Sequence, residues 1–327
     1  MQEDLTPMKK NLLALALAAA LLFTLVPAAG FAAASGAGGR LVVYTSVPTK
    51  QLNMAVAMFN SQYPGIVVDV FSAKDADLLS RVRAEGGASQ GDVLLGGSEA
   101  PFHSVESLLV PYLSKNLNAI HEAYLAQGTA YTPVQLNVSA MIVNPAAARQ
   151  LGADVKGWES LKDEKLAGKV LYMDPARFSA DERQAAFINM VADTVNIASP
   201  SAPSFVLNAV NAGQFAVGIT SEDKAIEYKA DNKDLQILYA QEGTAVSASY
   251  AGILAGADNE KNAQLFIDFL TSKAYQQAAA DELYLRSVRT DVDFALKGVV
   301  RTSELRAVNY DAMTLRLTAN ADFIAKR

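Results

Sequence analysis

Residues 41–97 read LVVYTSVPTKQLNMAVAMFNSQYPGIVVDVFSAKDADLLSRVRAEGGASQGDVLLGG, and this stretch decides the fold class. Apolar runs at residues 41–44, 66–71 and 92–95 predict three strands, and the intervals between them contain the apolar spacing of helices. Strands that alternate with helices predict an α/β protein with a parallel sheet. Ligands bind such sheets beyond the carboxyl ends of the strands. At these places the chain has small or hydroxyl-bearing residues, namely Ser46, Thr49, Gly96, Gly97 and Ser98.

The segment before this stretch has the three parts of a secretory signal. Lys9 and Lys10 precede an apolar run over residues 12–26, and small residues follow the run. We therefore expect residues 1–34 to be a leader and a cleaved signal peptide, which predicts a periplasmic protein. A retained membrane anchor is the alternative, but the run is shorter than the about 20 residues that a membrane span needs.

Composition limits the classes of function. The chain has no cysteine, which excludes disulfides, thiolate zinc sites, cysteine nucleophiles and a lipid-bearing cysteine at the cleavage site. Its Lys and Arg residues are scattered and the formal net charge is −6, so no nucleic-acid surface is predicted. Helix starts can still make a cleft locally positive for an anionic ligand. The about 290 residues of the mature chain exceed what one core usually serves, which predicts two lobes.

Two extended segments predict crossings between these lobes. Residues 131–143 form one long segment that can serve two sheets, and residues 248–255 provide a return crossing. The predicted lobes are an N-terminal one of residues 40–136 plus 250–297 and a C-terminal one of residues 137–249 plus 298–327.

Two further local patterns bear on the site. Residues 102–123 have helical spacing with irregular breaks, which predicts a broken helical region. Residues 220–223 follow a predicted strand, and their hydroxyl and acidic side chains predict a well-capped helix start.

Several segments, in a specific order, are similar to one known family. They are LLSRVRAEGGASQGDVLLGG at 78–97, MIVNP at 141–145, YMDPA at 172–176, VNAGQFAVGIT at 210–220 and NAQLFIDFLTS at 262–272. The chain resembles the periplasmic solute-binding subunits of ABC importers, in the group of ferric-iron-binding proteins and relatives that bind phosphorylated organic solutes. The resemblance implies a type II periplasmic-binding-protein-like fold, in which each lobe is a mostly parallel sheet flanked by helices and two crossing hinge strands join the lobes. It also implies a monomer that closes on its solute, needs no cofactor and docks transiently on a membrane permease.

Two departures from the family pattern concern the ligand. Iron-binding members resemble one another in a tyrosine pair just after the strand that corresponds to residues 215–219, because a phenolate suits ferric iron. Here the chain has Thr220-Ser-Glu-Asp-Lys224 and no adjacent tyrosines, so iron would depend on Glu222 and Asp223 or on a bound anion. The chain between residues 175 and 199 is also shorter than is usual for the family.

The candidate ligand-binding residues lie at predicted strand ends and helix starts. Hydroxyls and backbone N–H groups at these places can bind an oxyanion, since a helix start has partial positive charge, and Arg177 can pair bidentately with phosphate or carboxylate. The alternatives are helix capping for the hydroxyls and acids, a tight turn for the glycines, and solvation or a salt bridge for Arg177. The candidates are Ser46, Thr49, Gly97 and Ser98 from the first lobe, with Asp174, Arg177, Ser199, Ser201, Thr220, Ser221 and Glu222 from the second.

Signals for catalysis are weaker. Residues 87–91 match the G-x-S-x-G pattern of serine hydrolases, but a helix is predicted before them and a strand after them, the reverse of what the pattern requires. His103 and His121 have no predicted nucleophile nearby. We therefore interpret the chain as a non-catalytic receptor that closes about residues 135–139 and 247–252 on a phosphorylated or otherwise anionic organic solute. Ferric iron ranks close behind, and a secreted hydrolase or transferase and a sensor subunit are further alternatives.

Overall fold

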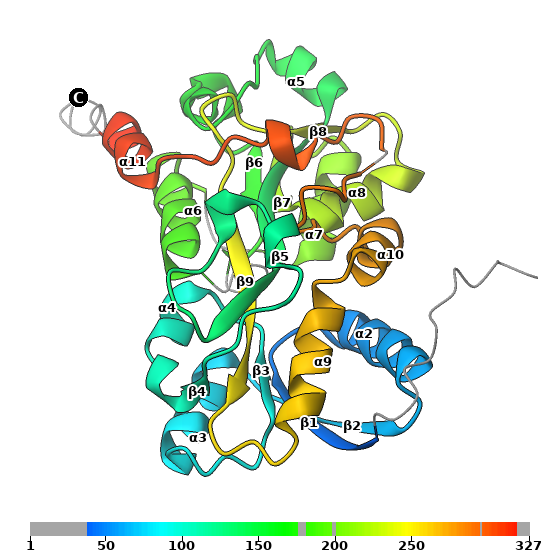
Figure 1. Cartoon of the computed structure of the whole chain (residues 1–327). Helices are drawn as coiled ribbons and strands as arrows, with labels where there is room; N and C mark the ends of the chain where they lie inside the picture. The colour runs from blue at the N-terminus through cyan, green and yellow to red at the C-terminus, as the bar shows by residue number, and fades with distance from the viewer. Residues whose placement is uncertain (1–37, 176–180, 198–200, 295, 319–327) are drawn as a thin grey trace, which may run out of the picture.

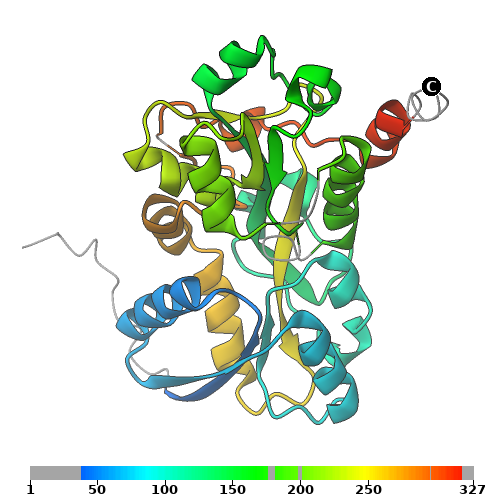
Figure 2. The same ribbon diagram turned by 180° about the vertical axis from the view of Figure 1, so that it is seen from behind.

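The computed structural model describes residues 38–175, 181–197, 201–294 and 296–318. In these ranges the chain forms two lobes, one above the other in Figure 1, with two long strands running between them. The view from behind shows the same division (Figure 2). No helix in the described ranges is long and apolar enough to cross a membrane. The predicted leader and signal peptide, residues 1–34, lie outside these ranges.

The first lobe has the strand, helix, strand, helix, strand order that the sequence predicted. Its helices return the chain so that β1 pairs in parallel with both β2 and β3. The strands are β1 (Gly39–Thr45), β2 (Ile66–Ser72), β3 (Val93–Leu95) and β4 (Leu109–Val110). The helices are α2 (Thr49–Gln62), α3 (Asp75–Glu85), α4 (Glu99–His103) and α9 (Glu260–Leu270).

The second lobe has shorter strands and more helices. Its strands are β6 (Val170–Tyr172), β7 (Val217–Ser221) and β8 (Gln236–Leu238). Its helices are α5 (Pro145–Leu151), α6 (Glu182–Thr194), α7 (Pro203–Asn211), α8 (Glu222–Asp231) and α11 (Tyr310–Thr318). Helix α10 (Lys273–Leu283) follows α9 and lies between the lobes in Figure 1.

Two crossing strands join the lobes, as predicted. They are β5 (Tyr131–Val143) and β9 (Val246–Leu254), which pair antiparallel with each other. Together they sit at the centre of the strand order β2-β1-β3-β9-β5-β7-β6, with β4 added beside β9 and β8 beside β5.

The sheets are mixed rather than mostly parallel. The parallel pairs are β1–β2, β1–β3 and β6–β7. Each described pair that includes β5 or β9 is antiparallel. The reason is that β5 and β9 cross between the lobes in opposite directions, so each brings an antiparallel neighbour into the sheets that it serves.

The broken helical region predicted over residues 102–123 is largely absent. The structure has the five-residue helix α4, then short 3₁₀ turns and the two-residue strand β4. Pro111 cannot donate a backbone hydrogen bond, and the Ser114 hydroxyl accepts the N–H of Asn116 (3.1 Å). Such local bonds compete with a continuous helix.

Each lobe has its own apolar core. In the first lobe, Phe59 is fully buried and meets Phe266 and Phe269 edge-on, with ring centroids 5.0 and 5.4 Å away. In the second lobe, the Trp158 indole packs edge-on against Phe187 and donates its N–H to the carbonyl of Gly243 (2.9 Å). These aromatic contacts hold the helices of each lobe on its sheet.

The segment from α10 onward contacts both lobes. Ala280 and Phe294 belong to a buried cluster with Ala225 and Ile237 of the second lobe, whereas Tyr275 and Ala279 pack in the core of the first. The predicted boundaries of the two lobes stay a prediction. Some residues of the segment 250–297 pack in the core of the first lobe, and others pack against the second lobe.

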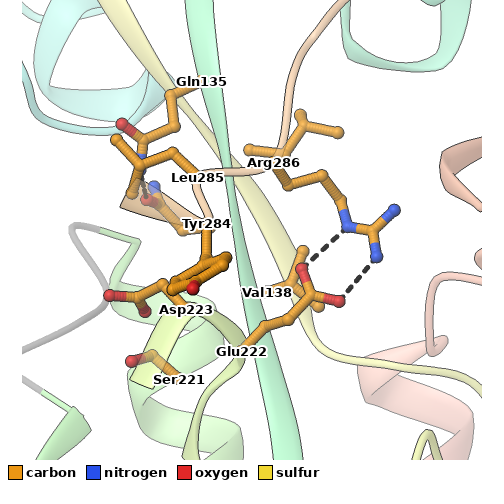
Figure 3. Close-up of a pocket in the computed structure, with 10 residues that line it drawn as sticks. Gln135, Val138, Ser221, Glu222, Asp223, Tyr284, Leu285 and Arg286 are labelled. Carbon is orange, nitrogen blue, oxygen red and sulfur yellow. Dashed lines mark hydrogen bonds and ion pairs between the residues drawn. The ribbon is translucent and has the colours of Figure 1, made fainter. Parts of the chain in front are cut away.

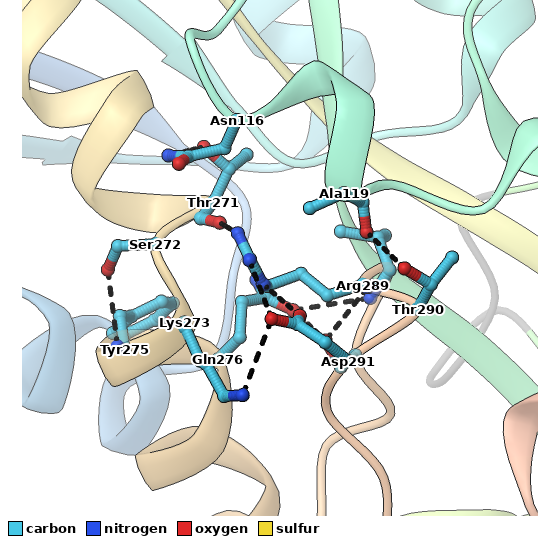
Figure 4. A network of polar contacts seen from close by, with 12 residues as sticks. Asn116, Ala119, Thr271, Ser272, Lys273, Tyr275, Gln276, Arg289, Thr290 and Asp291 are labelled. Carbon is cyan, nitrogen blue, oxygen red and sulfur yellow. Dashed lines mark hydrogen bonds and ion pairs between the residues drawn. The ribbon is translucent and has the colours of Figure 1, made fainter.

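Buried amides and one arginine tie the connection between α9 and α10 to the crossing strands. Gln276 donates its amide N–H groups to the carbonyls of Val134 and Leu270 (2.7 Å each). Arg289 forms two hydrogen bonds with the carboxylate of Asp291 and donates to the carbonyl of Thr271 (2.8 Å), as Figure 4 shows. These bonds satisfy polar groups that the packing of α10 removes from water.

We predict that Phe59→Ala lowers the free energy of unfolding by about 3–5 kcal/mol, because it leaves a cavity among buried rings. Phe205→Ala is the matched control, since that ring is 52% exposed, and we expect a change within about 0.5 kcal/mol. Urea denaturation of the two variants measures both values. Equal losses would contradict the assignment of Phe59 to the core.

Candidate functional site

A cleft of about 1030 Å³ lies between the lobes and is lined by both. The first lobe contributes the loops that follow β1, β2 and β3, and the second contributes the chain after β6 and the starts of α7 and α8. The crossing strands β5 and β9 form its floor through Gln135, Asn137 and Ser249. The carboxyl ends of the parallel strands of the first lobe therefore meet the cleft, as the sequence predicted.

Four helices begin at this cleft without a side-chain cap. Pro48, Lys74 and Ser221, the N-cap residues of α2, α3 and α8, line the cleft, as does Pro203 at the start of α7. None of the four N-cap side chains accepts a hydrogen bond from its own helix. The first-turn N–H groups that make no bond within these helices can bond to a ligand, and the helix dipoles favour negative charge there. Helix α7 offers fewer of them, because Pro203 has no N–H and Phe205 donates to the carbonyl of Ala202 (3.0 Å).

Three of the helices that begin elsewhere have a side-chain cap. Asn144, Asp181 and Ser272 cap α5, α6 and α10, each accepting a backbone N–H of the first turn. The starts of α4 and α9 lie outside the cleft lining and have no such cap. The cap predicted at residues 220–223 is wrong in this respect, because Ser221 occupies the N-cap position of α8 but its hydroxyl makes no cap bond. What distinguishes the cleft is that four uncapped starts gather at one place.

The floor of the cleft is a chain of side-chain hydrogen bonds. Gln51 of α2 donates to Gln135 (2.6 Å), Gln135 donates to Asn137 (3.1 Å), and Asn137 donates to the hydroxyl of Ser249 (2.8 Å). Because the Ser249 oxygen accepts the last bond, its own O–H is left to donate. The chain links a helix of the first lobe to both crossing strands.

The structure brings half of the candidates of the first lobe to the cleft. Ser46 and Gly97 line it, and Gly96 lies beside them. Thr49 is the exposed first residue of α2, outside the lining. Ser98 is 2% exposed and also lies outside the lining, because its side chain is buried where α4 begins.

The candidates of the second lobe divide in the same way. Asp174 and Ser221 line the cleft. Thr220 is fully buried, and Ser201 pairs with Met173 in an isolated β-bridge, so neither is part of the lining. Two further candidates, Arg177 and Ser199, lie outside the described residues.

Glu222 and Asp223 point in opposite directions (Figure 3). Asp223 lines the cleft, whereas the Glu222 carboxylate is buried against Arg286, with N–O distances of 2.8 and 2.6 Å. The Tyr239 hydroxyl donates to the same carboxylate. Burial and the negative charge of Glu222 raise the pKa of Tyr239, so it remains a donor. The Glu222 carboxylate is therefore directed to Arg286 and not into the cleft, and its predicted ligand contact stays a prediction.

Sequence reasoning missed several lining residues. Lys74, Asp75 and Lys224 lie in helix starts, and Gln135 and Asn137 lie two residues apart on β5. A signal for the last two exists, because they are polar residues within an otherwise apolar strand of alternating faces.

The charges at the cleft are mixed. Lys224 forms an ion pair with Glu227 (2.8 Å); burial opposes its charge, but this bond and the nearby Asp223 raise its pKa. Lys50 of α2 reaches the same Glu227 of α8 across the gap between the lobes (3.7 Å). The cleft therefore combines a cation, uncapped helix starts and carboxylates that can accept hydrogen bonds from hydroxyl groups.

The described residues provide little for a metal ion. They contain no group of three or more His, Asp or Glu side chains placed to hold one, and no tyrosine is part of the described cleft lining. Ferric iron is bound best by hard anionic oxygen ligands. The lining contains the carboxylates of Asp75, Asp174 and Asp223, but these three are not placed to hold one metal ion together.

Comparison with known proteins gives a family and a fold. The family described as bacterial extracellular solute-binding protein matches residues 54–298. An uncharacterized protein of Haemophilus influenzae is 26% identical over 330 residues, covering 93% of each chain. The periplasmic binding protein AfuA of Actinobacillus pleuropneumoniae, with fructose-6-phosphate bound, is 23% identical, with a TM-score of 0.66 over 88% of this chain and 99% of its own. Iron-bound HitA of Pseudomonas aeruginosa is 18% identical, with a TM-score of 0.69 over 86% of this chain and 99% of its own. These likenesses confirm the predicted type II periplasmic-binding-protein fold.

We predict that Gly96→Ala lowers the free energy of unfolding by about 3 kcal/mol, because a side chain is strained at this φ of +107°. The added Cβ would also collide with the Ser46 hydroxyl. Gly168→Ala is the matched control, since its φ is +67° and nothing lies within 4 Å of its Cβ. We expect it to cost about 1 kcal/mol. Thermal denaturation compares the two, and equal costs would contradict the close approach of Gly96 to Ser46.

Proposed function

This chain belongs to the family of bacterial extracellular solute-binding proteins, and we propose that its solute is a small phosphorylated organic anion. The observation that carries the proposal is the set of four uncapped helix starts at one cleft. The protein acts as the periplasmic receptor of an ABC importer, exported by its signal peptide. It works as a monomer, binds no nucleic acid and delivers the solute to a membrane permease by transient docking.

The helix starts favour phosphate over a neutral group. A phosphate ester has several acceptor oxygens and up to two negative charges, and a free helix start offers N–H donors together with positive potential. Two such starts face the cleft from each lobe, so one anion can draw the lobes together. AfuA, a protein with the same fold, binds fructose-6-phosphate.

The volume and the floor favour an organic group on the phosphate. A cleft of about 1030 Å³ is far larger than inorganic phosphate requires. The amide and hydroxyl groups of Gln135, Asn137 and Ser249 can pair with hydroxyls, and Asp75 and Asp223 can accept hydrogen bonds from hydroxyls. We therefore rank a hydroxylated phosphate ester above a bare anion.

Ferric iron, free or with a synergistic anion, is the alternative ligand. HitA is an iron-bound protein of the same fold. In this chain Glu222 pairs with Arg286, so only Asp223 of the two acids proposed for iron faces the cleft. Iron would need the other cleft carboxylates and a bound anion to complete its coordination.

Release and capture follow from the two-lobed shape. The ligand stabilises the closed arrangement because it bonds to helix starts of both lobes, and closure bends the chain at β5 and β9. The ion pair of Lys50 with Glu227 adds a contact between the lobes at 3.7 Å. Both side chains are largely exposed, so this contact contributes little to stability by itself.

We propose no catalytic activity. Ser89 of the G-x-S-x-G match lies in the loop between α3 and β3, and its hydroxyl donates to the Glu85 carboxylate (2.9 Å). His103 contacts Glu106 on an exposed surface (3.1 Å). His121 is partly buried, which lowers its pKa, and it lies outside the cleft lining. These groups do not form a nucleophile and base at the cleft.

We predict that phosphate esters raise the melting temperature of the mature protein. A ligand at 100 times its Kd stabilises the folded state by about 2.7 kcal/mol. Thermal shifts with fructose 6-phosphate, glycerol 3-phosphate, a phosphonate, inorganic phosphate and ferric citrate, followed by titration calorimetry, test this expectation. A coloured ferric complex, together with no response to phosphate esters, would contradict the proposal.

We predict opposite effects of Ala202→Asp on stability and binding. Asp at the N-cap of α7 adds about 1 kcal/mol to the free energy of unfolding. Its charge repels an anion at the helix start, so we expect the affinity for the phosphate ester to fall about tenfold. Ala202→Asn caps the helix without charge and serves as the matched control in calorimetry. The same affinity in both variants would argue against an anion at this end of the cleft.

A further inference from the structure

We propose that the buried ion pair between Glu222 and Arg286 positions the start of α8 for the ligand. The two side chains are 3% and 1% exposed, respectively. The Glu222 carboxylate accepts both guanidinium N–H donors, and the Tyr239 hydroxyl completes its surroundings (Figure 3). Glu222 is thus a positioning residue rather than a ligand contact. For the identity of its ligand, the inference rests on the proposed function.

The pair controls the direction of the α8 start. Glu222 is the first residue of α8, and its neighbours Ser221 and Asp223 line the cleft. In Figure 3 these neighbours point away from Arg286 while Glu222 points toward it. Because successive helix residues are about 100° apart, fixing Glu222 on one side turns the other first-turn groups toward the cleft.

Arg286 is itself fixed to the crossing strand. Its carbonyl accepts the N–H of Leu136 of β5 (3.0 Å). Its guanidinium also donates to the Thr302 hydroxyl and the Val300 carbonyl (2.9 Å each). The pair therefore connects the hinge to the start of α8, although 64 residues separate Glu222 from Arg286 in the sequence.

A cavity of about 30 Å³ lies beside the pair, where α8 starts next to the floor of the cleft. The ion pair itself lines it, together with Ser221 and Asp223 of α8 and Gln135 and Asn137 of β5. The pair therefore holds the helix start at a place where the start is not closely packed against the floor. Such a pair is also a poor choice for stability alone, because apolar residues in its place often serve as well or better.

The experiment removes both charges and compares the result with a second arginine–carboxylate pair, whose arginine is 8% exposed and whose carboxylate is 41% exposed. The test variant is Glu222→Gln with Arg286→Met, which removes both charges of the pair. Asp293, the second carboxylate near Arg286 (3.9 Å), is 30% exposed and keeps the hydrogen bond from the N–H of Thr302. The control is Arg289→Met with Asp291→Asn, which removes another bidentate arginine–carboxylate pair that has no contact with the cleft lining (Figure 4). Each variant is measured by urea denaturation, by hydrogen exchange, and by calorimetry with fructose 6-phosphate.

We expect the test variant to keep a cooperative unfolding transition. The amides of residues 225–228, the first whose N–H groups bond within α8, should exchange at least about tenfold faster than in the wild type, because the α8 start opens locally. The affinity for fructose 6-phosphate should fall at least about tenfold, while the control changes neither quantity. Arg286→Lys keeps the charge but loses the bidentate geometry, and should give the same pattern if the double variant does not fold.

Two results would overturn the inference. One is unchanged exchange at the start of α8 in a folded test variant. The other is an equal loss of affinity in the control, which would indicate general loosening of the protein. If fructose 6-phosphate and the other phosphate esters do not bind the wild type, the proposed function fails, whereas the exchange measurement still decides whether the pair positions α8.

Discussion

The antiparallel pairing of β5 with β9 is the constraint on which the rest of the structure depends. Both strands are buried between the lobes, so their backbone groups must be satisfied without water, and the strands satisfy each other. Side chains are then free for other bonds, and Gln135, Asn137 and Ser249 bond to one another at the cleft floor. Since β5 and β9 also carry the sheets of both lobes, a change in the angle between the lobes must occur at these strands.

Four helix starts without side-chain caps gather at the cleft. A side-chain cap stabilises a helix by about 1 kcal/mol, and the chain uses such caps at Asn144, Asp181 and Ser272. At the cleft it does without them, although Ser221 is a residue type that could cap α8. A helix that starts at the cleft is therefore less stable than it would be with a side-chain cap, and its unbonded first-turn N–H groups can bond to a ligand. Such a local loss is typical of binding sites.

Local patterns made most of the fold predictable. Residues 131–143 were predicted with the observed bounds, because they form a long apolar run of extended character. Ser46, Gly97, Asp174 and Ser221 were found because strand ends and helix starts are readable from the sequence. The short turns after α4 and the partner of Glu222 were not predictable. They depend on tertiary contacts, and no local pattern indicates that a carboxylate will meet Arg286.

The start of α8 shows how one pair of acids acquires two roles. Glu222 and Asp223 are adjacent, so the helix directs them to different sides, one to Arg286 and one to the cleft. Their sequence alone favoured a shared role as first-turn acids or as iron ligands. The buried guanidinium decides between these roles, because it neutralises Glu222 and leaves Asp223 beside Lys224 at the cleft. Asp223 beside a cation suits the recognition of a hydroxylated anion better than the coordination of ferric iron, which calls for several anionic ligands together, and the described residues form no such group around it.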